Sequence, residues 1–205
     1  MTPLARVIQA ALKDPMALAR GLWPDVRFYR EQRDIIYSVE HDDETVVTAG
    51  NMLGKDFVSA FIAISFFIRK HPVKIITSSA TEPHLNTLWG EMDRFIRTST
   101  LPLVFDRGGP LVYNHREIRK VVNGQVEKEV YLLGRVASSE NRGEGLSGHH
   151  AKHTLWICDE ASGVPDVAYA AAQGWAKRML IIGNPNPTDN FFFKAVTEGN
   201  VLAPA

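Results

Sequence analysis

Residues 49–56 carry the residue types that bind phosphate groups. They read Ala-Gly-Asn-Met-Leu-Gly-Lys-Asp and lie between an expected strand and an expected helix. Two glycines let the backbone curl so that its N–H groups face an anion, and the following helix adds its positive end. The lysine of such a loop reaches the β- and γ-phosphates of a nucleotide. The sequence therefore predicts nucleotide contacts by Ala49, Gly50, Asn51, Met52, Leu53, Gly54, Lys55, Asp56 and Phe57.

This loop departs from the common phosphate-loop pattern at both ends. That pattern is Gly, four residues, and then Gly-Lys followed by Ser or Thr. Ala49 stands at the first glycine, and Asp56 stands at the hydroxyl position. Asp56 can still hold Mg²⁺ through its carboxylate, because magnesium prefers oxygen ligands. A strand–turn–helix junction with a solvated lysine is the alternative interpretation.

An acidic pair, Asp159 and Glu160, ends the apolar segment 155–158. In an ATP-hydrolysing site Asp159 would bind Mg²⁺, directly or through water, and Glu160 would polarise the attacking water as general base. Acidic residues also occur at helix N-termini that follow strands, which is the alternative explanation. Together with the phosphate loop, the pair predicts an ATPase that uses ATP and Mg²⁺.

Three other positions fit an ATP pocket. The ring of Tyr29 can stack on adenine, and the amide of Gln32 can read the adenine edge with one donor and one acceptor. An amphipathic helix start with Tyr29 and Ile36 in the core is the alternative. Asn184 follows a later apolar strand, where a polar side chain can sense the γ-phosphate. The motif Ser78-Ser79-Ala80-Thr81, expected after the second strand, is a candidate for coupling or nucleic-acid contact.

Arginine and histidine residues supply further candidates. Arg142, in the glycine-rich loop 138–150, can stabilise charge on transferred phosphoryl oxygens in its own subunit or a neighbour. Arg135 is the second candidate for that role, and a surface arginine is the alternative. The loop histidines lack a carboxylate or cysteine at metal-site spacing, so we expect them to stabilise the loop or touch DNA. These are His149, His150 and His153, and a separate basic stretch that is a candidate for DNA contact comprises His115, Arg116, Arg119 and Lys120.

The elements that must position these residues alternate between strands and helices. Strands are expected over 45–48, 73–78, 154–158 and 178–182, and helices over 55–70, 82–98 and 167–173. This alternation predicts a parallel, helix-covered α/β sheet. Residues 111–137, with an Asn123-Gly124 turn, predict a β-hairpin insertion, and residues 4–21 predict short helices broken at Pro15. We expect a helical segment over 1–22 and a P-loop ATPase domain over 23–205.

Composition excludes several classes of protein. The chain has 23 Lys+Arg and 23 Asp+Glu, so its net charge is zero, and any DNA contact must come from a local patch or several subunits. Its one cysteine, Cys158, excludes an internal disulfide. The most apolar run, residues 57–68, is too short to span a bilayer, so we expect a buried helix and no membrane partner.

The order of these motifs resembles the ATPase domain of large terminase subunits, the motors that package DNA in tailed bacteriophages. The resemblance covers roughly residues 23–197 and is carried by FYREQ, AGNMLGKD, ITSSAT, the NRGEG loop, LWICDEA and IGNP. It implies an α/β P-loop NTPase fold of the additional-strand, conserved-glutamate (ASCE, RecA-like) type. It also implies catalytic roles for Lys55, Glu160 and Arg142, metal binding by Asp56 and Asp159, and coupling through Asn184.

The resemblance implies partners as well. Such proteins form a homo-oligomeric ring, expected to be a pentamer, on the portal protein of a procapsid and drive double-stranded DNA inward. They act with a small terminase subunit in the host cytoplasm, transiently at the portal vertex. Many carry an arginine where Asn51 stands here. They normally continue into a nuclease domain, which we expect this chain to lack, so nuclease activity is not expected of it.

Two other functions stay open from the sequence alone. One is a fragment of a superfamily 2 helicase-like ATPase, which would need a second RecA-like domain. The other is a nucleotide-binding scaffold that does not hydrolyse ATP. Asn51 and Asp56 favour the scaffold, whereas the intact Asp159-Glu160 pair argues against it.

Overall fold

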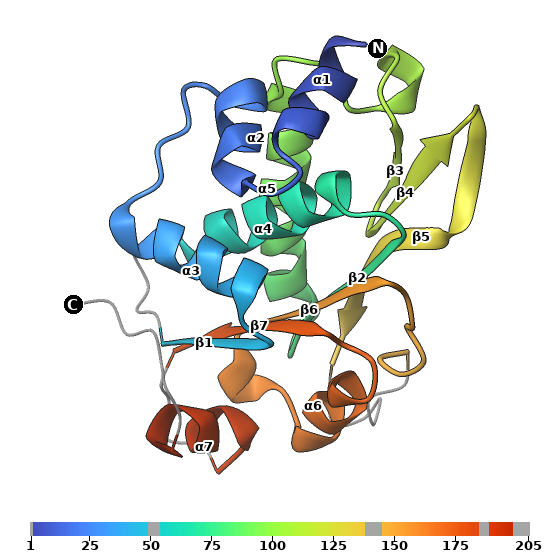
Figure 1. Ribbon diagram of the computed structural model, residues 1–205. Coiled ribbons are helices and arrows are strands. Elements are labelled where there is room, and N and C mark those ends of the chain that lie inside the picture. Colours follow the sequence, from blue (N-terminus) through green and yellow to red (C-terminus); the bar gives the residue numbers. More distant parts are fainter. Residues whose placement is uncertain (1, 49–53, 138–144, 185–188, 199–205) are drawn as a thin grey trace.

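A computed structural model of the chain describes residues 2–48, 54–137, 145–184 and 189–198 (Figure 1). Its described part is organised around a seven-stranded sheet in the order β1-β7-β6-β2-β5-β4-β3. The first five strands in this order are parallel, and β5, β4 and β3 are antiparallel. The strands are β1 (Glu44–Thr48), β2 (Val73–Ser79), β3 (Leu111–Asn114), β4 (Glu117–Val122), β5 (Gln125–Val136), β6 (His153–Asp159) and β7 (Arg178–Gly183).

The strand order confirms the expected α/β fold with a mainly parallel sheet. β1 precedes the predicted phosphate loop, and β6 ends at the acidic pair. β7 lies between these two strands and pairs with both. This inserted strand is the additional strand that the resemblance implies.

Helices cover both faces of the sheet (Figure 1). The five N-terminal helices lie on one face, and α6 and α7 lie on the other. The helices are α1 (Pro3–Ala10), α2 (Pro15–Leu22), α3 (Arg30–His41), α4 (Lys55–Arg69), α5 (Glu82–Thr98), α6 (Asp166–Gln173) and α7 (Phe191–Glu198), with short 3₁₀ turns η1 (Phe105–Arg107) and η2 (Ala161–Gly163).

Alternating side chains of each strand fill two apolar layers. In β6, Leu155 and Ile157 pack in the layer under α1 to α5, whereas Trp156 and Cys158 pack in the layer under α6 and α7. This is the two-residue period of a strand that is buried on both faces. Cys158 is fully buried there, and burial raises the pKa of its thiol well above the usual value.

Helix α4 confirms the buried helix expected from the apolar run. Every residue from Val58 to Arg69 in α4 is buried, because the helix lies between the sheet and the other helices of its face. In the part of the chain that the structure describes, no helix combines the length and the apolarity needed to cross a membrane.

The predicted hairpin is present, but the last strand of the segment belongs to the main sheet. Asn123 (φ 51°) and Gly124 (φ 77°) form its turn in the left-handed region, as a two-residue hairpin turn requires. β5 then continues past β4, and Tyr131 to Val136 pair in parallel with β2. The expectation of an insertion over the whole of residues 111–137 is therefore wrong, because Leu132 and Leu133 are buried in the sheet.

The two N-terminal helices form where the sequence predicts them. Pro15 is the first residue of α2, and Asp14 caps the helix by accepting from the N–H of Met16 at 2.8 Å. Leu18 and Leu22 of α2 are fully buried in the layer that also holds α4. A domain division after residue 22 stays a prediction.

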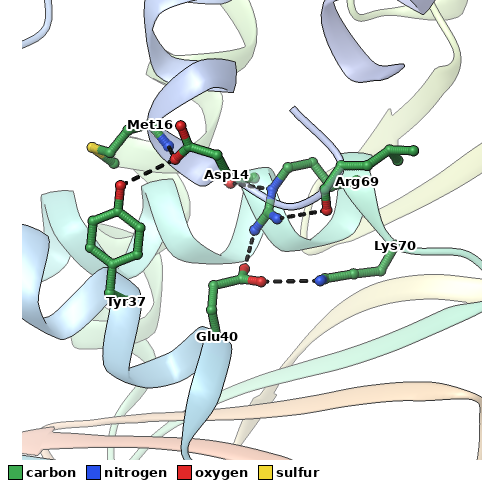
Figure 2. A network of polar contacts seen from close by, with 8 residues as sticks. Asp14, Met16, Tyr37, Glu40, Arg69 and Lys70 are labelled. Carbon is green, nitrogen blue, oxygen red and sulfur yellow. Dashed lines mark hydrogen bonds and ion pairs between the residues drawn. The ribbon is translucent and has the colours of Figure 1, made fainter. Parts of the chain in front are cut away.

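A buried ion pair joins α3 to the end of α4 (Figure 2). Arg69 at the end of α4 contacts the carboxylate of Glu40 on α3, and Lys70 contacts the same carboxylate at 3.0 Å. Arg69 also donates to the Leu12 carbonyl between α1 and α2 at 3.4 Å. Burial raises the pKa of Glu40, but the two cations outweigh burial, and the net pKa is lowered.

Candidate active site

The carboxyl ends of the parallel strands meet along one edge of the sheet. Thr48 of β1 pairs with Gly183 of β7, and Asp159 of β6 pairs with Ser79 of β2, which also pairs with Val136 of β5. The segments that carry the predicted chemistry leave the sheet at this edge. Ligands of open α/β sheets bind outside the carboxyl ends of the strands.

Lys55 and Glu160 lie in contact at this edge. Lys55 is the first residue of α4, and its ammonium Nζ forms an ion pair with the Glu160 carboxylate after β6. The side chains are 11% and 20% exposed, so water can still reach them in part. The structure therefore brings the phosphate-loop lysine and the proposed general base into one place.

Two more carboxyl groups share this electrostatic environment. Burial, together with the negative charges of Asp56 and Glu160, raises the pKa of Asp159 to about 7. Burial also raises the pKa of Asp56, where Lys55 opposes the shift and Glu160 adds to it. A nearby cation stabilises the charged forms of carboxylates that repel each other in a partly buried site.

The donor set fits a magnesium ion bound together with phosphates. The Oδ1 atom of Asp159 is buried and has no hydrogen-bond partner within the described ranges. The described residues contain no group of three His, Cys, Asp or Glu that could hold a metal by itself. Magnesium is usually held by one or two carboxylates together with waters and substrate phosphates. Asp159 and Asp56 can supply such carboxylate oxygens.

Glu160 has an unusual backbone conformation. Its φ of 49° and ψ of 48° lie in the left-handed region, which non-glycine residues rarely adopt. This conformation turns the chain from β6 directly into the 3₁₀ turn η2. Such strain persists only where the surrounding structure holds it, and it is common at active sites.

Gln32 lies against the end of the phosphate loop. Gly54 precedes α4 with a φ of 63°, and a Cβ atom there would lie 3.1 Å from the Gln32 Nε2 atom. Gln32 is 6% exposed and accepts from the N–H of Tyr29 at 3.2 Å. The Tyr29 ring is 73% exposed, so it is open to a base, whereas Ile36 is 2% exposed and belongs to the core. A core role for Tyr29 is therefore wrong.

Comparison with known proteins links the chain to a phage protein. No family model matches the chain. The chain is 27% identical over 195 residues to a probable terminase large subunit of Enterobacteria phage P7. This match covers 88% of the chain, which spans 38% of the length of that relative.

Three similar structures come from phage terminases. The large terminase ATPase domain of Thermus phage P74-26 has a TM-score of 0.55 at 16% identity, over 78% of this chain and 67% of that one. The HK97 large terminase has a TM-score of 0.59 at 15% identity, over 99% and 43%. The large terminase of another thermophilic bacteriophage, solved in complex with ADP, has a TM-score of 0.56 at 14% identity, over 86% and 45%.

The resemblance to large terminase subunits is confirmed. At these identities the solved structures establish the fold, and the sequence match supplies the link to the phage protein.

Five of the predicted nucleotide contacts and the predicted catalytic arginine lie outside the residues that the structure describes. They are Ala49, Gly50, Asn51, Met52, Leu53 and the loop arginine Arg142. Asn184, half-buried, directly follows β7, and Arg135 is exposed near the carboxyl end of β5. Both thus lie at the edge of the sheet where Asp159 ends β6.

Phe57 belongs to an aromatic cluster beside the site. Its ring lies 5.5 Å from the Phe28 ring and 5.0 Å from the Phe95 ring, measured between centroids. The Phe57 side chain thus packs α4 against the rings of Phe28 and Phe95. A nucleotide contact by this residue stays a prediction and would use its backbone.

Both serines of the motif predicted to follow β2 lie inside that strand. Ser78 and Ser79 are fully buried, and the Trp156 indole donates to the Ser78 Oγ atom at 2.7 Å. The turn begins only at Ala80, because all seven residues of β2 are buried between neighbouring strands. Ser78 therefore supports the core beneath the site and does not face DNA.

The basic stretch, in the turn before β4 and on β4 itself, makes contacts within the chain. Lys120 is buried and donates to the Lys70 carbonyl at 2.7 Å, at the end of α4. Arg116 pairs with Glu82, and Arg119 pairs with Glu117. These contacts leave His115 as the exposed member of the stretch.

His149 holds the loop that precedes β6. Its Nδ1 atom shares a hydrogen bond with the Tyr131 hydroxyl at 2.8 Å, and its Nε2 atom lies 2.9 Å from the Gly145 carbonyl. Its ring also packs edge-on against Trp175 at 5.0 Å. The expected role in stabilising this loop is consistent with these contacts.

The sequence did not indicate that Asn190 lies beside the site. Asn190 contacts the turn after Glu160 from the start of α7. An Asn directly before an apolar run is typical of a helix start, and this signal alone does not indicate a tertiary contact.

Proposed function

We propose that this chain is the ATP-hydrolysing motor domain of a viral large terminase, which couples hydrolysis to movement of double-stranded DNA into a procapsid. The contact between Lys55 and Glu160 carries the proposal, because it joins the residues proposed to bind phosphate and to activate water at one edge of the sheet. The match to a phage terminase supports this reading of the pocket.

The residues divide the chemistry between them. The Lys55 ammonium and the N-terminal end of α4 would bind the phosphates. The Glu160 carboxylate would accept a proton from the attacking water as general base. The Gln32 amide and the exposed Tyr29 ring would hold the adenine.

Two further groups would complete the site. Mg²⁺, held by Asp159 and Asp56, would neutralise charge on the phosphates when it is bound. Arg142, or Arg135 in its place, would stabilise the charge that develops on the transferred phosphoryl group. Because a neighbouring subunit can supply this arginine, a ring of subunits fits the proposed reaction. We propose that this ring is a pentamer on the portal protein, supplied with DNA with the help of a small terminase subunit at the procapsid vertex.

The decisive experiment measures phosphate release with and without double-stranded DNA. We expect Glu160→Gln to keep ATP binding and to lose turnover by about 100-fold or more, the usual contribution of a general base. Glu129→Gln is the matched control and should turn over normally, because the Glu129 side chain is 84% exposed and contacts Lys74 at the amino end of β2, away from the carboxyl ends of the strands. Chelating Mg²⁺ should abolish turnover of every variant.

The outcomes separate the proposal from its rival. Specific activity that rises with protein concentration would support an arginine supplied by a neighbour. Binding of ATP without turnover under any condition would favour the scaffold, which Asp56 at the hydroxyl position also favours. A chain that neither binds nor hydrolyses ATP would overturn the motor proposal.

A further inference from the structure

The side-chain amide of Asn190 contacts three carbonyl groups of one turn. Its Nδ2 atom donates to Ala161 at 3.0 Å, to Ser162 at 3.1 Å and to Val164 at 3.1 Å. These carbonyls belong to the segment that directly follows Glu160. An amide nitrogen carries only two hydrogens, so the three acceptors share them and enclose the donor.

The same turn is packed tightly on its other sides. A Cβ atom on Gly183 would lie 2.9 Å from the Ala161 nitrogen and 3.4 Å from the Phe192 ring. A Cβ atom on Gly163 would lie 2.9 Å from the Cβ atom of Ala80 at the end of β2. The turn is thus enclosed by β7, by α7 and by the segment after β2.

Helix α7 is anchored to this region by its own first residues. The N–H of Phe191 donates to the Asp166 Oδ1 atom at 2.7 Å. The Asn190 Oδ1 atom accepts from the N–H of Phe193 at 3.2 Å, as a helix cap does. Asn190 therefore contacts both the start of α7 and the turn after Glu160.

The backbone of Glu160 needs such support. Its left-handed conformation is followed by two backbone hydrogen bonds of the turn, Gly163 to Glu160 at 3.0 Å and Val164 to Ala161 at 3.1 Å. A strained residue keeps its conformation only where its neighbours fix it. The amide of Asn190 adds its three contacts to these two bonds and so ties the turn to a second element.

We propose that Asn190 is a positioning residue that holds Glu160 in the orientation for activating water and links that orientation to helix α7. The inference rests on the proposed ATPase function, since it assigns Asn190 a task only if Glu160 is the general base. Asn190 acts through the turn of residues 161–164 and takes no part in the proposed chemistry itself.

Asn190→Asp is the sharpest variant for this proposal. The aspartate keeps the oxygen that caps Phe193 and replaces the donating nitrogen by an oxygen that faces three carbonyls. We expect kcat to fall by about 10-fold or more, because misplacement of a catalytic group by a fraction of an ångström is costly. ATP affinity should stay within about twofold, since Lys55 and the end of α4 are unchanged. Thr197→Ala, on the exposed part of α7, is the matched control and should behave as the unsubstituted chain.

Two further readouts distinguish positioning from general support of the fold. In a Glu160→Gln background, Asn190→Asp should cause no additional loss of kcat, because residues that act as a unit are non-additive. Amide hydrogen exchange of residues 161–164 should accelerate in Asn190→Asp, while exchange in α4 and β2 should stay unchanged.

Each outcome decides the question. Unchanged kcat in Asn190→Asp, or an equal further loss in the Glu160→Gln background, would overturn the positioning role while the ATPase function stands. A parallel loss of kcat, affinity and thermal stability would also overturn it, because that pattern indicates a folding defect. If the unsubstituted chain does not hydrolyse ATP, the proposed function fails first and this inference fails with it.

Discussion

Lys55 and Glu160 form an ion pair although 105 residues separate them in the chain. The strand order explains the contact, because only β7 lies between the strands β1 and β6 that carry them to the same edge. The pair couples the charge of one side chain to that of the other. Removing one of them should therefore alter both the proposed phosphate binding and the proposed activation of water.

Lys55→Ala should weaken nucleotide binding. We expect the affinity for ADP with Mg²⁺ to fall by about 10-fold or more, because the lysine proposed to contact the phosphates is lost. Isothermal titration calorimetry measures this change directly. Lys152→Ala, at an exposed position, is the control and should bind like the unsubstituted chain. Equal affinities of Lys55→Ala and the control would show that the phosphates bind elsewhere.

Lys120 should make stability depend on pH above neutrality. Burial lowers its pKa to about 8 from 10.5, with Glu127 opposing the shift. Between these values the unfolded chain holds more protons than the folded chain, so stability rises with pH. We expect the free energy of unfolding to increase by about 2 kcal/mol more from pH 7 to pH 9.5 in the unsubstituted chain than in a chain without the Lys120 amine.

Lys120→Met is the variant that tests this dependence. It keeps most of the apolar stem and lacks the charge, so its stability should lack this increase, whereas the loss of stability caused by deprotonation of Cys158 in the unfolded chain should be the same in both proteins. Urea unfolding at several pH values measures the difference. The range ends at pH 9.5 because tyrosines such as Tyr169, with its pKa raised to about 12 by burial, would act in the opposite direction above it. A parallel rise in both proteins would disprove the assignment to Lys120.

Arg69 should be important for stability and unimportant for chemistry. The Arg69→Met variant leaves the Glu40 carboxylate buried with Lys70 as its remaining partner (Figure 2). Breaking a buried pair in this way typically costs about 3–5 kcal/mol. Arg30→Met is the control, because Arg30 is 85% exposed and 3.9 Å from Asp34, and its loss should change the melting temperature little. Equal melting temperatures of the two variants would refute a stabilising role.

Local patterns predicted the elements around the site well. The glycine-lysine junction, the apolar segment before Asp159 and the helical spacing of residues 82–98 each depend on neighbours in the chain. The structure places α4, α5 and β6 within a residue of the expected bounds. The Asn123-Gly124 turn was also predictable, because few residues adopt its left-handed backbone.

Contacts between distant segments were not predictable in the same way. Lys120 belongs to a basic stretch in the sequence, and only the position of β4 beside the end of α4 buries it. β5 resembles a hairpin strand until its second half pairs with β2. The contacts of Asn190 with the turn after Glu160 depend on how α7 docks, which no local pattern encodes.

Cys158 faces the apolar layer beneath α6 and α7, and it is the one thiol of the chain. Thiol-reactive dyes act on accessible thiolates, so a folded chain should remain unlabelled. A single cysteine introduced on the surface would then accept one fluorophore at a chosen position with the native thiol left in place. Distances between subunits could thus be followed by energy transfer without first redesigning the core.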